Sequence, residues 1–509
     1  MREPPPDDPN QPRLDEASSG GGSTGAFDAL DVRIDPAELP AEALSDVGAI
    51  DDAPPEEVPP GAVVSADWLP DDVRAQVRRT MRLSVFEGSL TQVFLNWTSG
   101  AVLIGYMLHV GARPAEIALV GSVPLLAQVA SPFAAFLAAV LGHRKLLTVL
   151  LALVSRTSWL LAAALPVLPV APELRPVFLV ALVLVASFFL AGNGTLWTAW
   201  MGDVVPERER GRYFGLRTGI TGVVGMLANL LAGWWLDRVG APLSFQVVIT
   251  VAVATALIGV WIYWQQYDPP TVRERLRLRE IVTVPLADPG FRRFLAFAVY
   301  WTFVVFLAAP FVFPYFLDEL RLTFTQVAIW STIAATASMA TTVLWGRAAD
   351  RVGNKAVLAV GTFIAGVGLP GAWIAAGATG WIGFIWISAV LDAIAWGAIG
   401  PATFNLALVS APRQNRVLFI AMWSLTSGVA GFLGGALSGP LLIGFQSLSG
   451  SLGHDGWVAY GALFALSGVL RAFTWVWLRR VPEANAWRTR ELLRSMRTGW
   501  KGVGFPWRS

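Results

Sequence analysis

The sequence contains no cysteine and only three histidines among its 509 residues. Disulfides are therefore excluded, and a zinc site built from the usual Cys and His ligands is not expected. The sequence also lacks a Gly-x4-Gly-Lys-Ser/Thr phosphate-binding loop, which argues against an ATP-driven pump within this chain. No nucleophile–base set is visible, so we expect neither an enzyme nor a bound cofactor.

Charged residues are scarce as well. Asp, Glu, Lys and Arg make up 15% of the chain and hydrophobic residues 54%. A soluble domain of this size could not bury so much apolar surface. The apolar residues form continuous runs of about 20 residues, whereas a membrane β-barrel needs strands of about 10 residues with alternating polarity. The sequence therefore predicts an all-α integral membrane protein with the lipid bilayer as its surroundings.

We expect twelve transmembrane helices, arranged as six, a linker and six. The predicted spans begin near Leu83, Ala115, Leu146, Pro176, Tyr213 and Pro242, and then near Phe294, Phe324, Ala356, Gly380, Val417 and Trp457. The expected regions are a disordered acidic tail over 1–72, a six-helix bundle over 73–265, a cytoplasmic linker over 266–293, a second six-helix bundle over 294–478 and a basic amphipathic tail over 479–509.

Basic residues gather in alternate loops, which predicts the orientation. One set of loops carries residues such as Arg144, Arg210 and Arg351, whereas the opposite loops carry only four arginines, Arg113, Arg175, Arg238 and Arg321. The basic set should face the cytoplasm, so we expect a multi-pass protein of the cell membrane with both termini inside. The basic C-terminal tail suits an anionic lipid surface, and neither a nucleic-acid partner nor an oligomer is expected.

The two halves repeat each other. Pro206 and Arg210 recur at a constant offset as Pro412 and Arg416, and three glycines of span 5 recur at the same offset in span 11 as Gly428, Gly431 and Gly439. Halves with the same span order are related by an axis along the membrane normal. Glycines at such spacing let helices approach closely. Static packing and sliding during a transport cycle both remain open as their role.

The stretch from Gly346 to Lys355 matches a loop signature, Gly-x3-Asp-Arg-x-Gly-x-Lys/Arg, of the major facilitator superfamily, and Asp203 to Gly215 resembles that family's loop between spans 4 and 5. The chain thus resembles this family over roughly residues 80–480. The resemblance implies a secondary transporter that moves a small-molecule substrate by alternating access, with proton coupling as an option. A non-transporting receptor or scaffold on the same fold is the alternative. The gating residues implied are Gly346, Asp350, Arg351, Gly353, Lys355, Asp203 and Arg210.

The loop between spans 2 and 3, where this family usually keeps the signature best, departs from it. It reads Ala135 to Lys145 and lacks the acid and the first glycine. The gating role that this signature implies is therefore expected for the second half. There, Asp350 would meet the free N–H groups at the start of span 5, near Phe214 and Gly215.

In this family spans 1, 4, 7 and 10 line the central cavity. The candidate substrate contacts are Gln92, Asn96, Asn193, Trp197, Tyr300, Asp392 and Trp396, and interhelical hydrogen bonding is the alternative role for them. Asp392 lies near the middle of span 10, where an ionised acid costs roughly 3 kcal/mol. Proton coupling, a structural role and substrate contact all remain open for it. Glu87 is the second coupling candidate, and Arg156 and Arg471 are expected to be structural.

Overall fold

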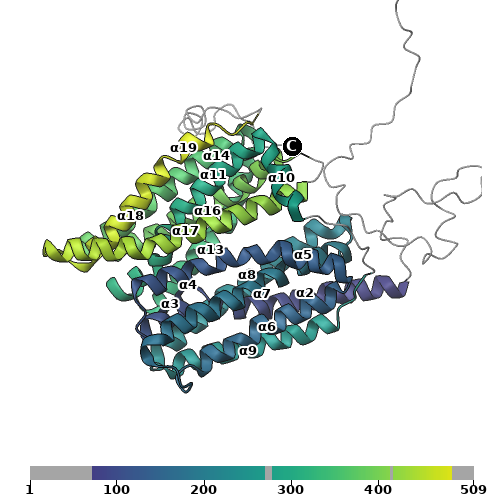
Figure 1. Ribbon diagram of the computed structural model, residues 1–509, viewed down its shortest axis with the longest axis horizontal. Helices are drawn as coiled ribbons and strands as arrows, with labels where there is room; N and C mark the ends of the chain where they lie inside the picture. Colours follow the sequence, from purple (N-terminus) through teal and green to yellow (C-terminus); the bar gives the residue numbers. More distant parts are fainter. Residues whose placement is uncertain (1–70, 270–277, 413–415, 484–509) are drawn as a thin grey trace, which may run out of the picture. The chain divides into compact units, whose positions relative to one another are not determined.

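The computed structural model describes residues 71–269, 278–412 and 416–483. Residue contacts divide the chain into Met1–Val64 and Ser65–Ser509, and every described residue belongs to the second unit. All regular elements in the described ranges are helices (Figure 1). The predicted acidic tail lies almost wholly outside the described residues, as does most of the basic C-terminal tail, so both stay predictions.

The first half of the described chain forms one series of long helices. Its elements are α2 (Asp71–Trp97), α3 (Gly100–His109), α4 (Pro114–Leu126), η3 (Ala127–Val129), α5 (Ala130–Leu141), α6 (Arg144–Ala164), η4 (Pro172–Leu174), α7 (Arg175–Val204), α8 (Glu207–Arg238) and α9 (Leu243–Trp264). A short helix, α10 (Leu278–Ala287), occupies part of the predicted linker, and residues 270–277 of that linker lie outside the described ranges.

The second half repeats the pattern of long helices, with short interruptions at prolines and glycines. Its elements are α11 (Pro289–Phe306), η5 (Ala309–Phe311), α12 (Val312–Pro314), η6 (Tyr315–Glu319), α13 (Phe324–Val352), α14 (Asn354–Phe363), η7 (Ile364–Gly368), α15 (Leu369–Thr379), α16 (Gly383–Ser410), α17 (Arg416–Ser451), α18 (Gly456–Ala472) and α19 (Thr474–Leu478).

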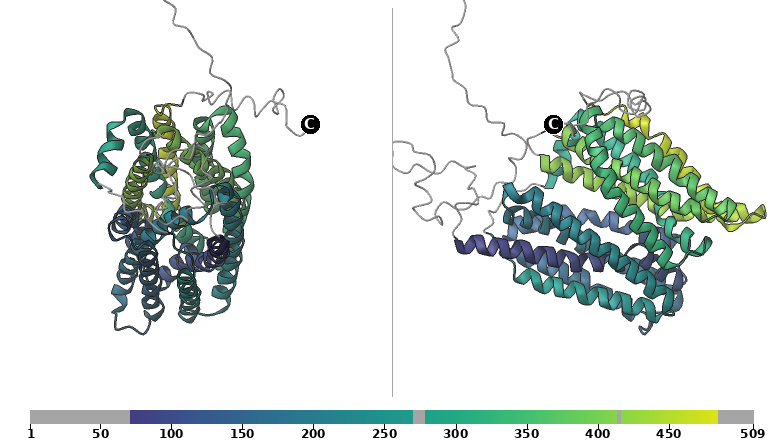
Figure 2. Two further views of the ribbon diagram at one scale, coloured as in Figure 1. Left: turned by 90° about the vertical axis from the view of Figure 1, so that its right-hand side faces the viewer. Right: turned by 180° about the vertical axis from the view of Figure 1, so that it is seen from behind.

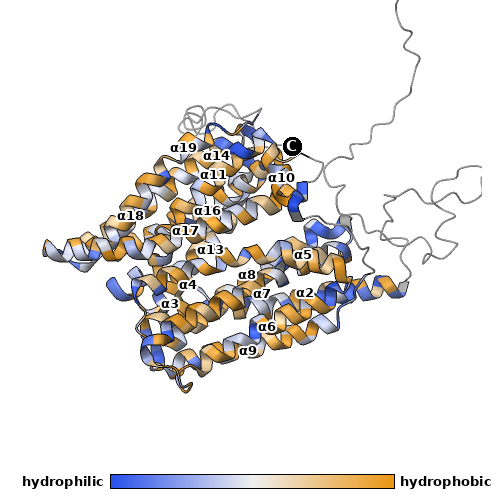
Figure 3. Cartoon of the chain, in the orientation of Figure 1, coloured by the Kyte–Doolittle hydropathy of each residue, from blue (hydrophilic) through white to orange (hydrophobic). Residues whose placement is uncertain are grey.

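Eleven helical segments of the described chain are long and apolar enough to cross a membrane. They correspond to eleven of the twelve predicted spans, and Figure 3 shows hydrophobic residues along most of their length. The predicted first span, from Leu83, is not among them. Its helix α2 carries four arginines and Glu87, and it ends at Trp97. The chain resumes as α3 at Gly100, whose φ of 56° is one that favours glycine.

Each half packs largely against itself, and two antiparallel helix pairs join the halves. Within the halves α6 lies on α7, α2 on α9, α13 on α16 and α11 on α17. Across the halves α8 lies beside α13, and α4 lies beside α17. Figures 1 and 2 show both pairs where the purple-to-teal first half meets the green-to-yellow second half.

Four of the α17 glycines face α4 in the opposite half, namely Gly428, Gly431, Gly435 and Gly439, whereas Gly434 faces Phe303 of α11 in its own half. A Cβ at Gly428 would lie 2.6 Å from the carbonyl oxygen of Leu125, and one at Gly439 would lie 2.9 Å from the carbonyl oxygen of Pro114. Both distances are too short for any side chain, so glycine is required for α17 to contact the backbone of α4. The glycines of α8 differ in how closely they contact their neighbours. A Cβ at Gly215 or Gly219 would meet nothing within 4 Å.

Candidate functional site

A cavity of about 450 Å³ lies between the halves, with α2, α3 and α8 on one side and α13 on the other. Its size falls within the range of small-molecule sites. The polar residues that line it include Gln92, Asn96, Asn229, Ser331 and Thr332. Two of the seven predicted substrate contacts, Gln92 and Asn96, are therefore lining residues, and the other five are not.

Small residues on α8 bring these amides together. Asn229 follows Gly225 by four residues and precedes Gly233 by four, so all three share one face of the helix. A Cβ at Gly225 would lie 2.9 Å from the Asn96 amide nitrogen, which is why α2 and α8 can approach here. A polar residue in register with the glycine series was the sequence signal that could have identified Asn229.

Several polar groups in the cavity are available to a ligand. Asn96 donates to the Gln92 carbonyl oxygen at 2.9 Å. The side-chain amides of Gln92 and Asn229, and the hydroxyl of Ser331, have no hydrogen-bond partner among the described residues. An amide offers both a donor and an acceptor, and a hydroxyl offers the same. None of the described lining residues is ionisable. The cavity therefore offers hydrogen bonds to a ligand but no charge that could compensate a charged one.

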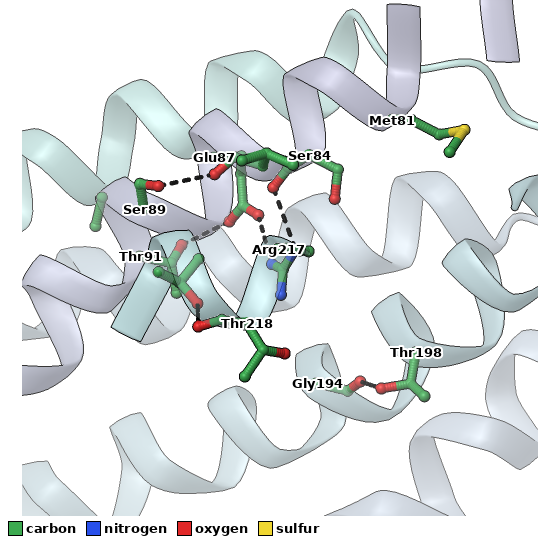
Figure 4. A network of polar contacts seen from close by, with 12 residues as sticks. Met81, Ser84, Glu87, Ser89, Thr91, Gly194, Thr198, Arg217 and Thr218 are labelled. Carbon is green, nitrogen blue, oxygen red and sulfur yellow. Dashed lines mark hydrogen bonds and ion pairs between the residues drawn. The ribbon is translucent and has the colours of Figure 1, made fainter. Parts of the chain in front are cut away.

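A buried charged network lies one turn from the cavity. Glu87 of α2 lies 3.1 Å from the guanidinium of Arg156 on α6 and 3.8 Å from that of Arg217 on α8. Thr91 donates to the Glu87 carboxylate at 2.5 Å, and Figure 4 shows this carboxylate between Thr91 and Arg217. Glu87 is 1% exposed, so its charge is compensated by two arginines rather than by water.

The structural role expected for Arg156 fits these contacts. Besides Glu87, its guanidinium donates to the carbonyl oxygen of Ala256 on α9 at 2.9 Å and lies over the ring of Tyr263. In the second half Arg471 of α18 donates to the carbonyl oxygens of Ala365 at 2.8 Å and Val305 at 3.1 Å. Each arginine therefore ties together helices of its own half.

Two further candidate contacts are engaged inside their own halves. Asn193 is buried, and its amide donates to the Thr148 carbonyl oxygen on α6 at 2.9 Å. Tyr300 donates its hydroxyl proton to the Leu470 carbonyl oxygen on α18 at 2.7 Å. These contacts correspond to the alternative of interhelical hydrogen bonding, and in this conformation neither side chain is available to a solute in the cavity.

The remaining candidates lie on α7 and α16. The ring of Trp197 lies under the Arg217 guanidinium, 4.1 Å from its carbon to the ring centroid. Asp392 is half-buried on α16, and Trp396, one turn further on, is 36% exposed. The Trp396 ring lies 6.3 Å from that of Trp301 on α11. Asp392 and Trp396 are therefore close to each other and to α11 but apart from the cavity.

The predicted gating loop of the second half is held mainly within that half. Gly353 separates α13 from α14 with a φ of 88°, a conformation that favours glycine. The Lys355 ammonium donates to the Val481 carbonyl oxygen at 2.6 Å. The amides of Asn354 and Lys355 donate to the Glu483 carboxylate at 2.9 and 3.0 Å. Glu483, which the sequence interpretation missed, therefore caps α14.

Asp350 is exposed, and no described residue forms a hydrogen bond or ion pair with it. A Cβ at Gly346 would meet nothing within 4 Å, and Arg351 is also exposed. The predicted contact between Asp350 and the start of α8 is thus not made in this conformation. It stays a prediction about another state of the protein.

The loop of the first half is paired differently. Asp203 at the end of α7 forms an ion pair with Arg144 at the start of α6. Arg210 donates to the Gly202 carbonyl oxygen at 2.8 Å, which closes the turn from α7 to α8. Lys145 donates to the carbonyl oxygens of Trp264 and Gln266, as Lys355 does to those of Arg479 and Val481. The same contact at the end of each half agrees with an internal repeat.

Comparison with protein families gives one match, to the model of the Major Facilitator Superfamily, which covers residues 86–323 and 308–508. No curated protein matches the chain significantly by sequence.

Solved structures with the same fold include transporters. A variant of the nucleoside transporter NupG is 15% identical, with a TM-score of 0.61 over 78% of this chain and 99% of that one. The xylose transporter XylE from E. coli, in an inward open conformation, is 14% identical, with a TM-score of 0.56 over 82% and 99%. A bacterial homologue of the lysosomal transporter Spinster, inward-facing and occupied, is 16% identical, with a TM-score of 0.59 over 84% and 99%. At these identities the similarity concerns the fold.

Proposed function

Because the chain belongs to the Major Facilitator Superfamily, we propose that it is a secondary active transporter that moves a small, uncharged, polar solute by alternating access. The family match and the long apolar helices identify the chain as a multi-pass membrane protein of a transporter family. The nature of the solute, the mechanism and the orientation belong to the proposal.

The cavity between the halves is the observation that carries this proposal. It holds the unpartnered amides of Gln92 and Asn229 and the hydroxyl of Ser331, and its apolar walls include Met226 and Phe313. A solute that supplies hydroxyl, carbonyl or amide groups would satisfy these donors and acceptors. A charged solute would enter a site whose described lining has no group of opposite charge, and its desolvation would be uncompensated.

Some of the similar structures are transporters of solutes in this class. They include a nucleoside transporter and a D-xylose–proton symporter. Nucleosides and D-xylose are uncharged and carry several hydroxyl groups, which amide side chains can both donate to and accept from.

The basic loops would face the cytoplasm, as the distribution of positive charge predicts. Of the two acids considered for proton coupling, Asp392 is favoured over Glu87. Glu87 is buried between two arginines as part of the helix packing, whereas Asp392 has no ion pair within 4.0 Å among the described residues. Coupling to a proton gradient through Asp392 remains a proposal.

Counterflow in proteoliposomes tests the proposal. The purified protein would be assayed with uridine, D-xylose and D-glucose, each beside its phosphate ester. We expect at least one uncharged solute to exchange and its phosphate ester not to compete. Asn229→Ala and Gln92→Ala should each raise the half-saturation concentration by about fivefold, because a buried polar group of the solute loses its hydrogen-bond partner. Gln446→Ala, on the exposed face of α17, is the control.

Competition by a phosphate ester at the concentration of its parent would contradict the solute class. Absence of exchange by every solute of the panel would contradict the proposal as stated and favour the receptor or scaffold alternative. No feature of the described residues specifically favours that alternative.

A further inference from the structure

The start of α13 is capped by a residue of the opposite half. The Asp237 carboxylate, at the end of α8, accepts hydrogen bonds from the amides of Phe324 and Thr325, both at 2.8 Å. These are charge-assisted bonds to a helix N-terminus, where the helix dipole also favours an anion. Asp237 therefore binds the two halves together at the end of the molecule opposite the basic loops.

The local sequence leaves these two amides for Asp237. Thr323 and Gln326 form a capping box, in which the Thr323 amide donates to Gln326 Oε1 at 2.9 Å and the Gln326 amide donates to Thr323 Oγ1 at 3.2 Å. The amides of Phe324 and Thr325 lie between them and have no partner within α13. Among the described residues, Asp237 supplies the acceptors for these two amides.

The same contact seats Phe324 in a socket made by two glycines. A Cβ at Gly233 of α8 would lie 2.8 Å from the Phe324 carbonyl oxygen, and a Cβ at Gly105 of α3 would collide with the Phe324 ring. The ring packs edge-on against Phe245 of α9, with the ring centroids 6.0 Å apart. Any side chain at either glycine would hold α13 away from the first half.

Phe324 also forms one end of the cavity. Phe324, Gly233 and Leu236 all line it, and they belong to the elements that Asp237 joins. The break between α2 and α3 contributes to this closure, because α3 contacts α12 and α13 of the second half.

We infer that Asp237 and Phe324 form the gate that closes the cavity at the end opposite the basic loops. Asp237 is a positioning residue that holds Phe324 in the glycine socket, and the gate opens when α13 leaves Asp237. Release breaks the two hydrogen bonds of the exposed Asp237 carboxylate and frees Phe324 from Gly105 and Gly233. The inference rests on the proposed alternating-access function, and it assigns to named residues the contact that must break for the cavity to open there.

Spin-label distances test the gate without any solute. The chain has no cysteine, so Gly240→Cys and Arg321→Cys provide two unique labelling sites on either side of the contact. Both residues are exposed. Double electron–electron resonance on the purified protein in nanodiscs would give the distance distribution. Asp237→Asn should raise the ratio of long to short distances by about tenfold, because the charged acceptor is lost.

Phe324→Ala and Gly105→Ala should shift the distribution in the same direction, so the test does not depend on one variant folding. Asp455→Asn is the matched control, because this exposed aspartate precedes α18 in the second half and its side chain makes no capping hydrogen bond. Unchanged distributions in Asp237→Asn and Phe324→Ala would overturn the inference. Because no solute is used, this outcome is separate from a failure of the flux assay.

Discussion

The Glu87 carboxylate lies 3.1 Å from the Arg156 guanidinium, and each side chain is 1% exposed. The pair links α2 to α6, and Arg217 extends it to α8. Gly88 gives Arg217 the room to do so, because a Cβ at that position would overlap the guanidinium. The acid proposed from the sequence as a coupling residue is therefore part of the packing of the first half.

Removing one partner of this pair should destabilise the protein. Glu87→Gln leaves Arg156 buried without its counter-ion, and we expect a loss of about 3–5 kcal/mol of stability. The purified variant should therefore melt at a clearly lower temperature than the wild type. Glu173→Gln, at an exposed acid before α7, is the control. If the melting temperature of Glu87→Gln were unchanged and its proton-driven uptake were abolished, Glu87 would instead be assigned to proton coupling.

Replacing a glycine of α17 with alanine should destabilise the protein more, the more closely that glycine contacts α4. Gly428→Ala places a methyl group 2.6 Å from the Leu125 carbonyl oxygen and should cost about 1–3 kcal/mol. Gly444→Ala, on the same helix, meets nothing within 4 Å and has the same gain in helix propensity. The difference in melting temperature between the two variants measures the contact alone. Equal temperatures would show that α4 and α17 are not tightly packed in solution.

Substitution of Asp350 should shift the conformational equilibrium in the direction opposite to substitution of Asp237. It lies at the end of α13 as Asp237 lies at the end of α8, and the two helices are antiparallel. If Asp350 caps the start of α8 when the basic end closes, Asp350→Asn should favour the conformation described here. The population of long distances between spin labels at positions 240 and 321 should then decrease. Asp72→Asn, at an exposed acid of α2, should leave this population unchanged. An increase would contradict the contact predicted for Asp350.

Asp392 should matter for accumulation and not for exchange. Asp392→Asn keeps the shape of the side chain but removes the proton-binding group, so uptake driven by a pH gradient should be abolished while counterflow persists. Asp318→Asn, whose side chain is 57% exposed near Arg321, is the control. Full gradient-driven uptake in Asp392→Asn would exclude Asp392 from proton coupling.

Much of the fold could be predicted from the sequence, because apolar run length is a local property. Eleven predicted spans agree with helices of the structure, and the break between Trp97 and Gly100 in the first span was missed. That break depends on a glycine backbone conformation and on contacts of α3 with the second half, neither of which hydropathy reports.

The site was harder to predict, because it depends on which helix faces meet. Gln92 and Asn96 were identified from one polar face of span 1, but Asn229, which lines the same cavity, was hidden in a glycine series. Asp237, at the end of α8, was not singled out from the sequence. Its role follows from two free amides 87 and 88 positions away, which no local pattern indicates.

Counterflow in proteoliposomes, with wild type and Asn229→Ala compared side by side, decides whether the cavity carries an uncharged polar solute. We predict exchange of an uncharged, hydroxyl-bearing solute by the wild type, a half-saturation concentration about fivefold higher in Asn229→Ala, and no competition from the phosphate ester of that solute. Exchange that is equal in the two proteins, or that the phosphate ester inhibits as well as its parent, would contradict it.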